Sequence, residues 1–144
     1  MLRGKRAVIT GGGGGFGQAL GVWLAREGVE VDFCARCADD IQKTCSVITA
    51  EGGMAKGYLC DLTQPESLSQ FSSQLLTSDK PIDILILNAA QWLSGTLDDQ
   101  PDTEIKYHQF RTDRFYSTDS GVTTWFKTFR KRRYRFNYIF MWDS

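Results

Sequence analysis

Five consecutive glycines, residues 11–15, lie between a short apolar run and a segment with helical spacing. Arg6–Thr10 suits a buried strand, and the segment after the glycines has apolar residues at helical spacing, namely Phe16, Ala19, Leu20, Trp23 and Leu24. A strand that turns at glycines into a helix brings bare backbone amides to the positive end of a helix dipole. The sequence therefore predicts an anion site suited to a pyrophosphate. A flexible linker is disfavoured, because core-type segments flank the glycines closely.

The rest of the first ninety residues alternates strand-like and helix-like segments. Further strands are predicted over Val29–Ala35, Met54–Cys60 and Ile82–Leu87, and helices over Phe16–Glu27, Asp39–Glu51 and Pro65–Leu76. Such alternation, with helices of about a dozen residues, is typical of a parallel, doubly wound α/β sheet. In the second helix Ile41, Cys45 and Ile48 are expected to point inward.

Three motifs in this stretch occur in the order and at the spacing of one known family. Gly12, Gly14 and Gly17 satisfy the general GxGxxG fingerprint, although the run of glycines makes that register partly accidental. The segment 10–17 fits the family's TGxxxGxG motif, and 60–62 (Cys-Asp-Leu) resembles its Asp after the third strand. The segment 83–90 resembles its fourth strand running into NNAG, with Leu and Ala in place of the first Asn and the Gly. Residues 1–105 thus resemble the short-chain dehydrogenase/reductase family of the classical type.

The resemblance implies a Rossmann-type fold and a bound nicotinamide dinucleotide. The implied contacts are Thr10, Gly11, Gly15, Phe16 and Gly17 at the phosphates and helix start, Asp61 and Leu62 at the adenine, and Asn88 and Ala89 at the adenosine ribose. Two of these residues have an ordinary structural alternative. Asp61 would serve as a helix cap, and Asn88 as a strand-ending turn residue.

The residue after the second strand indicates which dinucleotide is preferred. The position that normally carries an acid for the ribose 2′-hydroxyl falls at Ala35, and Arg36 follows it. Asp32 lies inside the strand, out of that register. Without a carboxylate to repel it, a 2′-phosphate can bind the guanidinium as a fork. We therefore expect NADP rather than NAD; the alternative is that Arg36 is a solvated loop charge.

The zero net charge of the 144 residues hides two unlike parts. Residues 1–105 carry a net charge of −6, and residues 106–144 carry +6 together with 12 of the 18 aromatic residues. The second part contains no Leu, Ala, Glu or Pro, which is unusual for a globular segment. The sequence thus predicts an incomplete dinucleotide-binding portion over 1–105 and an aberrant tail over 106–144.

Two interpretations of the tail remain open. Basic and aromatic residues are interleaved over 125–136, as on a surface that binds phosphates and stacked bases, although nucleic-acid binding is the less favoured interpretation. Alternatively, the tail is the product of a frameshift. Reading the coding DNA of residues 106–125 one nucleotide later permits a string similar to the family's next helix, and the frame across 134–142 permits an apolar strand.

The catalytic residues that the resemblance implies are a Ser after the fifth strand and a YxxxK motif, and neither is present. None of the five tyrosines, Tyr58, Tyr107, Tyr116, Tyr134 and Tyr138, has a Lys four residues later. The family activity is reversible hydride transfer between NADP(H) and a carbonyl or alcohol. We expect a truncated member without turnover, and the alternative is a non-catalytic nucleotide-binding or regulatory module. Neither the substrate nor family-type oligomerisation can be predicted.

The sequence shows no signal peptide and no apolar run of membrane-spanning length. A cytoplasmic protein is therefore expected. The four cysteines, Cys34, Cys37, Cys45 and Cys60, are interpreted as reduced, buried or half-buried structural thiols. Cys34 and Cys37 have CxxC spacing, but no second pair or His follows at the spacing of a zinc site.

Overall fold

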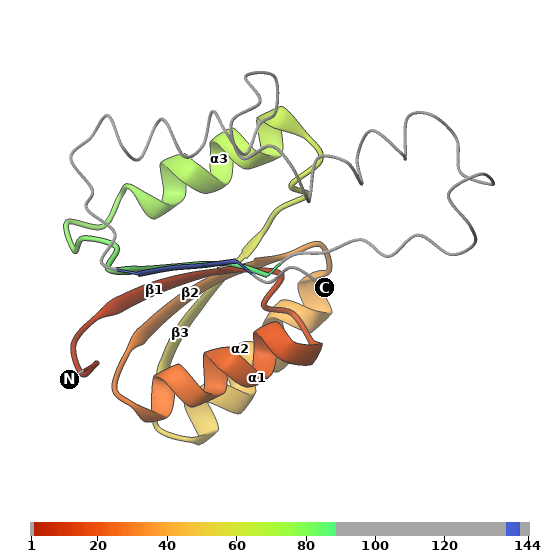
Figure 1. The fold of residues 1–144 in the computed structure, drawn as a ribbon. Coiled ribbons are helices and arrows are strands. Elements are labelled where there is room, and N and C mark those ends of the chain that lie inside the picture. The colour runs from red at the N-terminus through yellow and green to blue at the C-terminus, as the bar shows by residue number, and fades with distance from the viewer. Residues whose placement is uncertain (1, 89–137, 142–144) are drawn as a thin grey trace, which may run out of the picture.

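The computed structural model describes residues 2–88 and 138–141 (Figure 1). The elements in these ranges are strands β1 (Arg6–Thr10), β2 (Glu30–Ala35), β3 (Met54–Leu59), β4 (Ile84–Leu87) and β5 (Tyr138–Met141), and helices α1 (Gly15–Arg26), α2 (Ala38–Ala50) and α3 (Pro65–Leu75). The first four strands and the three helices lie close to their predicted bounds. The predicted division at residue 105 falls in residues 89–137, outside the described residues.

The strands form one parallel sheet in the order β3-β2-β1-β4-β5. Helices α1 and α2 cover one face of the sheet and α3 covers the other (Figure 1). After β3 the chain crosses to the far side of β1, so the direction of winding reverses between β1 and β4. This is the doubly wound, Rossmann-type α/β arrangement that the sequence predicts, and the fold class is confirmed.

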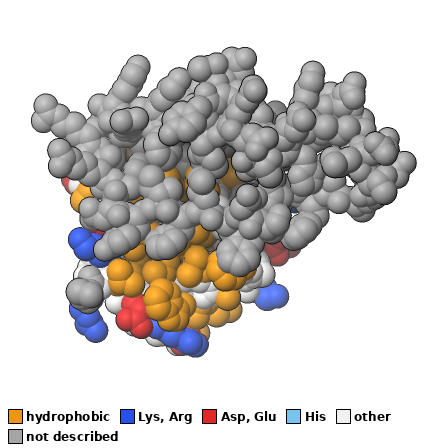
Figure 2. Space-filling model, viewed as in Figure 1, with side chains coloured by type: hydrophobic (Ala, Val, Ile, Leu, Met, Phe, Trp, Pro, Cys, Tyr) orange, Lys and Arg blue, Asp and Glu red, His pale blue; other side chains and the backbone are white. Residues whose placement is uncertain are grey.

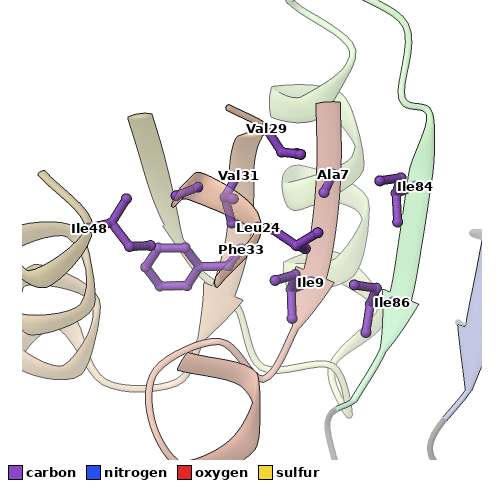
Figure 3. Packing of buried hydrophobic residues seen from close by; sticks show 10 residues of the cluster. Ala7, Ile9, Leu24, Val29, Val31, Phe33, Ile48, Ile84 and Ile86 are labelled. Carbon is purple, nitrogen blue, oxygen red and sulfur yellow. The ribbon is translucent and has the colours of Figure 1, made fainter. Parts of the chain in front are cut away.

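The core between the sheet and the layer of α1 and α2 is built from alternate residues of the strands. Ala7 and Ile9 of β1 face this layer, whereas Val8 faces α3, as the period of two in a strand requires. Figure 3 shows the cluster, which includes Ala7, Ile9, Leu24, Val29, Val31, Phe33, Ile48, Ile84 and Ile86. Because both faces of β1 are covered, all five of its residues are buried.

The buried face of α1 contains only some of the apolar residues found at helical spacing. Leu24 is buried, whereas Phe16 and Trp23 are 54% and 51% exposed, and hydrophobic side chains gather over this helix in Figure 2. The other buried residues of the helix are Gly17, Gly21 and Ala25. A Cβ on Gly21 would lie 3.6 Å from side-chain atoms of Ile9, Val31 and Ile48, so the glycine lets the helix approach the sheet closely.

A charged network lies within the opposite layer, under the end of α3. Arg6 is buried, and its Nε donates to Asp32 Oδ2 at 2.7 Å. Its two terminal nitrogens donate to the carbonyl oxygens of Leu75 and Lys80, at 3.0 and 2.8 Å. The guanidinium therefore binds the last carbonyl of α3 and one carbonyl of the loop after it while its charge is paired, which satisfies a buried cation. Hydropathy alone gave no indication of this pair.

Strand β5 is the one element of the described residues that was not predicted from the amino-acid sequence itself; only the alternative reading frame suggested a strand in this region. It pairs in parallel with β4, with Tyr138 opposite Ile84 and Met141 opposite Leu87. The four residues Tyr-Ile-Phe-Met are good strand formers, but a strongly basic segment precedes them. No helix within residues 2–88 is long and apolar enough to cross a membrane.

Candidate functional site

The predicted site residues in the described part of the chain follow the carboxyl ends of four strands. The glycine turn follows β1, Arg36 follows β2, Asp61 lies just beyond β3, and Asn88 follows β4. Because these strands are parallel, the residues lie along one edge of the sheet. The glycine turn and Asn88 flank the point between β1 and β4 where the winding reverses, which is where open α/β sheets bind ligands. Ala89 lies outside the described residues.

The glycine turn requires glycine at several positions for different reasons. Gly11 and Gly15 have positive φ angles of 72° and 53°, in the region that side chains disfavour. A Cβ on Gly17 would collide with the carbonyl oxygen of Gly11 and lie 2.6 Å from Asn88 Nδ2. On Gly12 it would lie 2.6 Å from the Cβ of Phe33. The TGxxxGxG register, with glycines at 11, 15 and 17, therefore matches the backbone geometry.

The turn presents backbone amides at the start of α1. Gly14 is the N-cap residue in an extended conformation, and the first turn of the helix contains no acidic residue. Within residues 2–88, the amides of Gly13 and Gly14 donate no hydrogen bond to the protein. A Cβ on Gly14 or Gly15 would meet no atom of the described residues within 4 Å. Among those residues, the open space, the two amides and the helix N-terminus together form an anion-binding arrangement.

Asn88 and Thr10 hold the turn to the end of β4. Asn88 Nδ2 donates to the carbonyl oxygen of Gly11, and its backbone amide donates to Thr10 Oγ1, both at 3.1 Å. The Thr10 hydroxyl donates to the Ile86 carbonyl oxygen at 3.5 Å, and Thr10 is buried. Asn88 is thus more than a strand-ending turn residue, because its side chain supports the glycine turn.

Arg36 and Asp61 face the same end of the sheet from neighbouring strands. Asp61 Oδ1 accepts hydrogen bonds from the Thr63 amide at 3.0 Å and the Thr63 hydroxyl at 2.7 Å. These bonds lower the pKa of the Asp61 carboxyl, and the positive charge of Arg36 lowers it further. Arg36 is exposed, and Leu62 is half-buried against the core. Asp61 closes a turn with Thr63 and is not the α3 cap, because Gln64 is the N-cap residue.

The cysteines differ in one respect from the expectation. Cys34 and Cys60 are buried and Cys45 is half-buried, whereas Cys37 is exposed. Cys37 is exposed because it lies beyond the end of β2, at the N-cap position of α2. A hydrogen bond with Cys60 and burial raise the pKa of the Cys34 thiol, so Cys34 remains protonated in the core.

Sequence reasoning overlooked a buried polar residue near the turn. Thr44, inside α2, is 1% exposed and contacts the glycine turn through its hydroxyl. The helical spacing predicted that Ile41, Cys45 and Ile48 point inward. Ile48 is fully buried, and Ile41 and Cys45 are half-buried. Thr44 lies on the same face, but only its neighbours in space reveal its role.

The chain is similar to one protein family over most of its length. The family model described as "short chain dehydrogenase" matches residues 5–117. The chain is 30% identical to a fatty acyl-CoA reductase of Acinetobacter baylyi over 76% of this chain and 36% of that protein. It is 32% identical to an uncharacterized oxidoreductase of Bacillus subtilis over 79% of this chain and 38% of that protein. It therefore spans little more than a third of these curated relatives.

Solved structures show the same likeness. A short-chain type dehydrogenase/reductase of Mycobacterium marinum matches with a TM-score of 0.68 and 33% identity, over 75% of this chain and 44% of that one. A metagenomic short-chain oxidoreductase in complex with NADP matches with a TM-score of 0.65 and 31% identity, over 72% of this chain and 47% of that one. The matched part of this chain thus corresponds to somewhat less than half of each of these neighbours.

Proposed function

Because this chain belongs to the short-chain dehydrogenase/reductase family, we propose that the carboxyl edge of its sheet binds a nicotinamide dinucleotide. The observation that carries this proposal is the pair of amides of Gly13 and Gly14, at the N-terminus of α1, which donate no hydrogen bond within residues 2–88. They lie beside the point where the winding of the sheet reverses. A pyrophosphate supplies the negative charge and the acceptor oxygens that such amides lack.

The phosphate part of the proposed site is the turn between β1 and α1. Gly11 and Gly15 give the turn its shape, and Gly17 lets the helix pack against it without a side chain in between. Thr10 ties the end of β1 to β4, and Phe16, exposed at the helix start, would lie against the cofactor.

The adenosine part of the proposed site lies at the ends of β3 and β4. We assign Asp61 to the adenine amino group, because Oδ1 is held by Thr63 and the carboxylate is ionised. Leu62 supplies apolar surface beside it for the ring. Asn88 and Ala89 would border the ribose.

Arg36 favours NADP over NAD in this proposal. Arg36 is exposed directly after β2, and Ala35, at the position that carries the acid in NAD-binding sites, has no carboxylate. The exposed guanidinium can donate two hydrogen bonds to a phosphate as a fork. One solved neighbour is an NADP complex, which agrees with this preference.

Fluorescence titration with NADPH and NADH tests both the site and the preference. Arg36→Ala is expected to weaken NADPH binding about tenfold and to leave NADH binding unchanged, because only NADPH carries the 2′-phosphate. Arg26→Ala is the matched control, since Arg26 is an exposed arginine at the far end of α1, paired with Glu51. Equal losses for both dinucleotides would refute the role of Arg36, and no binding of either would refute the site.

The family activity, oxidoreduction of a carbonyl or alcohol with NADP(H), is a proposal for the whole protein. The sequence contains no YxxxK motif, whose Tyr would donate a proton and whose Lys would lower the pKa of that Tyr. We therefore propose that this chain binds the cofactor without turnover. NADPH oxidation measured with a panel of ketones and aldehydes tests this. Turnover above the rate of a Gly17→Trp variant would contradict it.

We also propose that residues 106–144 are not a native continuation of this domain. The composition changes sharply near residue 105, and the family match, which includes residues 106–117, does not extend over the rest of this part. Sequencing both strands of the gene around codon 106 tests the frameshift. A single uninterrupted frame, with no family-like continuation in the neighbouring frame, would contradict it.

A further inference from the structure

A buried hydroxyl connects α2 with the glycine turn. Thr44 Oγ1 donates to the carbonyl oxygen of Gly12 at 3.2 Å and accepts a hydrogen bond from Gln18 Nε2 of α1 at 2.8 Å. Thr44 is 1% exposed, so water does not compete for these bonds. The hydroxyl thus joins both helices of this layer to one peptide group of the turn.

The peptide group in question is the one that carries the Gly13 amide. Peptide bonds are planar and trans, so the carbonyl of Gly12 and the N–H of Gly13 point in opposite directions. Holding the Gly12 oxygen toward Thr44 therefore aims the Gly13 N–H away from the core. On its other side, the Gly12 amide donates to the Cys34 carbonyl oxygen of β2 at 3.0 Å, so Gly12 is fixed at both ends.

Close packing of α2 on the sheet keeps Thr44 within reach of the turn. A Cβ on Gly57 of β3 would collide with Ile41 Cγ2 of α2, so this glycine allows the helix to lie close to the strand. At the other end of α2, a Cβ on Gly53 would lie 2.9 Å from Ile48 Cγ2. The position of the hydroxyl is therefore set by the core and not by a mobile side chain.

We propose that Thr44 is a positioning residue for the dinucleotide site, which sets the direction of the Gly13 N–H toward the pyrophosphate. The inference rests on the proposed function, because it assumes that the turn binds a pyrophosphate. Thr44 itself does not touch the ligand. Its effect is confined to the phosphate part of the site and leaves the adenosine part, at Arg36 and Asp61, unchanged.

The test compares two ligands that differ in their pyrophosphate. NADPH contains one, whereas adenosine 2′-monophosphate has the 2′-phosphate and adenine alone. Thr44→Val, which keeps the shape and removes the hydroxyl, is expected to weaken NADPH binding about three- to tenfold, as loss of one hydrogen bond implies. Binding of adenosine 2′-monophosphate, measured by competition with NADPH, is expected to stay the same. Thr44→Ser, which retains the hydroxyl, should restore NADPH binding.

A loss of stability alone does not produce this pattern. Ser72→Ala is the matched control, because Ser72 is also buried and its hydroxyl donates to Leu68 within α3, away from the turn. It should lower stability without changing either affinity. Should Thr44→Val not fold, Thr44→Ala is expected to give the same result. Equal NADPH affinity in Thr44→Val and the wild type, or equal losses for both ligands, would overturn the role of Thr44 but not the proposed function. A wild-type chain that binds no NADPH would overturn the proposed function with it.

Discussion

The side-chain amide of Asn88 donates a hydrogen bond to the carbonyl oxygen of Gly11 at 3.1 Å, joining positions that are 77 residues apart in the chain. This bond links the end of β4 to the turn after β1, across the point where the winding of the sheet reverses. The shape of the anion site therefore depends on the fourth strand as well as on the local glycines.

Replacing Asn88 with Ala should destabilise the folded state by about 1–3 kcal/mol, because the Gly11 carbonyl oxygen loses its donor in a partly buried place. Urea unfolding followed by circular dichroism measures the change. Ser46→Ala, which removes an exposed hydroxyl bonded to Gln42 within α2, should change stability little. Similar unfolding curves for the two variants would contradict the role of Asn88.

Gly17→Ala should destabilise the chain by about 1–3 kcal/mol or more, because the new methyl group would collide with the Gly11 carbonyl oxygen. Gly14→Ala is the matched control, since a Cβ there meets no atom within 4 Å and the backbone is extended. Thermal unfolding should show a lower midpoint for Gly17→Ala alone. Equal midpoints would show that the helix does not pack against the turn in this way.

Asp32→Ala should destabilise the chain by about 3–5 kcal/mol, because it leaves the buried Arg6 charge without its carboxylate. The exposed pair of Arg26 and Glu51 has nearly the same N–O distance, 2.7 Å, yet Arg26→Ala should have little measurable effect. Urea unfolding of both variants checks the contrast. A small effect of Asp32→Ala would mean that the Arg6 guanidinium reaches water.

Deprotonation of Tyr58 should lower the free energy of unfolding as the pH rises from 10 to 12. Burial and the negative charge of Asp32 raise the pKa of this phenol to about 12 from its ordinary value of 10. The folded chain thus keeps the proton at a pH where the unfolded chain has lost it, and the stabilisation present below pH 10 disappears as the pH rises to 12.

Tyr58→Phe removes this titration. The difference in unfolding free energy between the wild type and Tyr58→Phe should therefore shift against the wild type when the pH is raised from 9 to 11. A difference that stays constant over this range would show that the Tyr58 hydroxyl is not shielded from water.

Local sequence patterns predicted the strands and helices of residues 2–88 well, because strand-like and helix-like segments alternate and each helix ends near a glycine or a turn. They did not show which apolar residues of α1 are buried: Leu24 is buried, whereas Phe16 and Trp23 are 54% and 51% exposed. The buried face also contains Gly21, which lies against the sheet, and Gly17, which lies against the glycine turn, since only glycine permits such a close approach. Spacing alone does not show which side of the helix is buried.

The sequence predicted which residues lie at the candidate site, but not the contacts between elements that support it. Motifs identified residues at the ends of strands, because parallel strands bring their carboxyl ends to one edge. The contacts of Arg6 with Asp32, and of Thr44 with Gly12, join different elements. Such pairs follow from the tertiary packing, and no spacing in the sequence encodes them.

The most direct test of the dinucleotide site is an NMR titration of the nitrogen-15-labelled chain with NADPH, observing the backbone amides of Gly13 and Gly14. The account predicts that both resonances shift and reach saturation together, because these N–H groups, which have no acceptor within residues 2–88, gain phosphate acceptors. Gly52, in the turn after α2 and away from the site, should not shift. Unchanged Gly13 and Gly14 resonances at saturating NADPH would contradict the account.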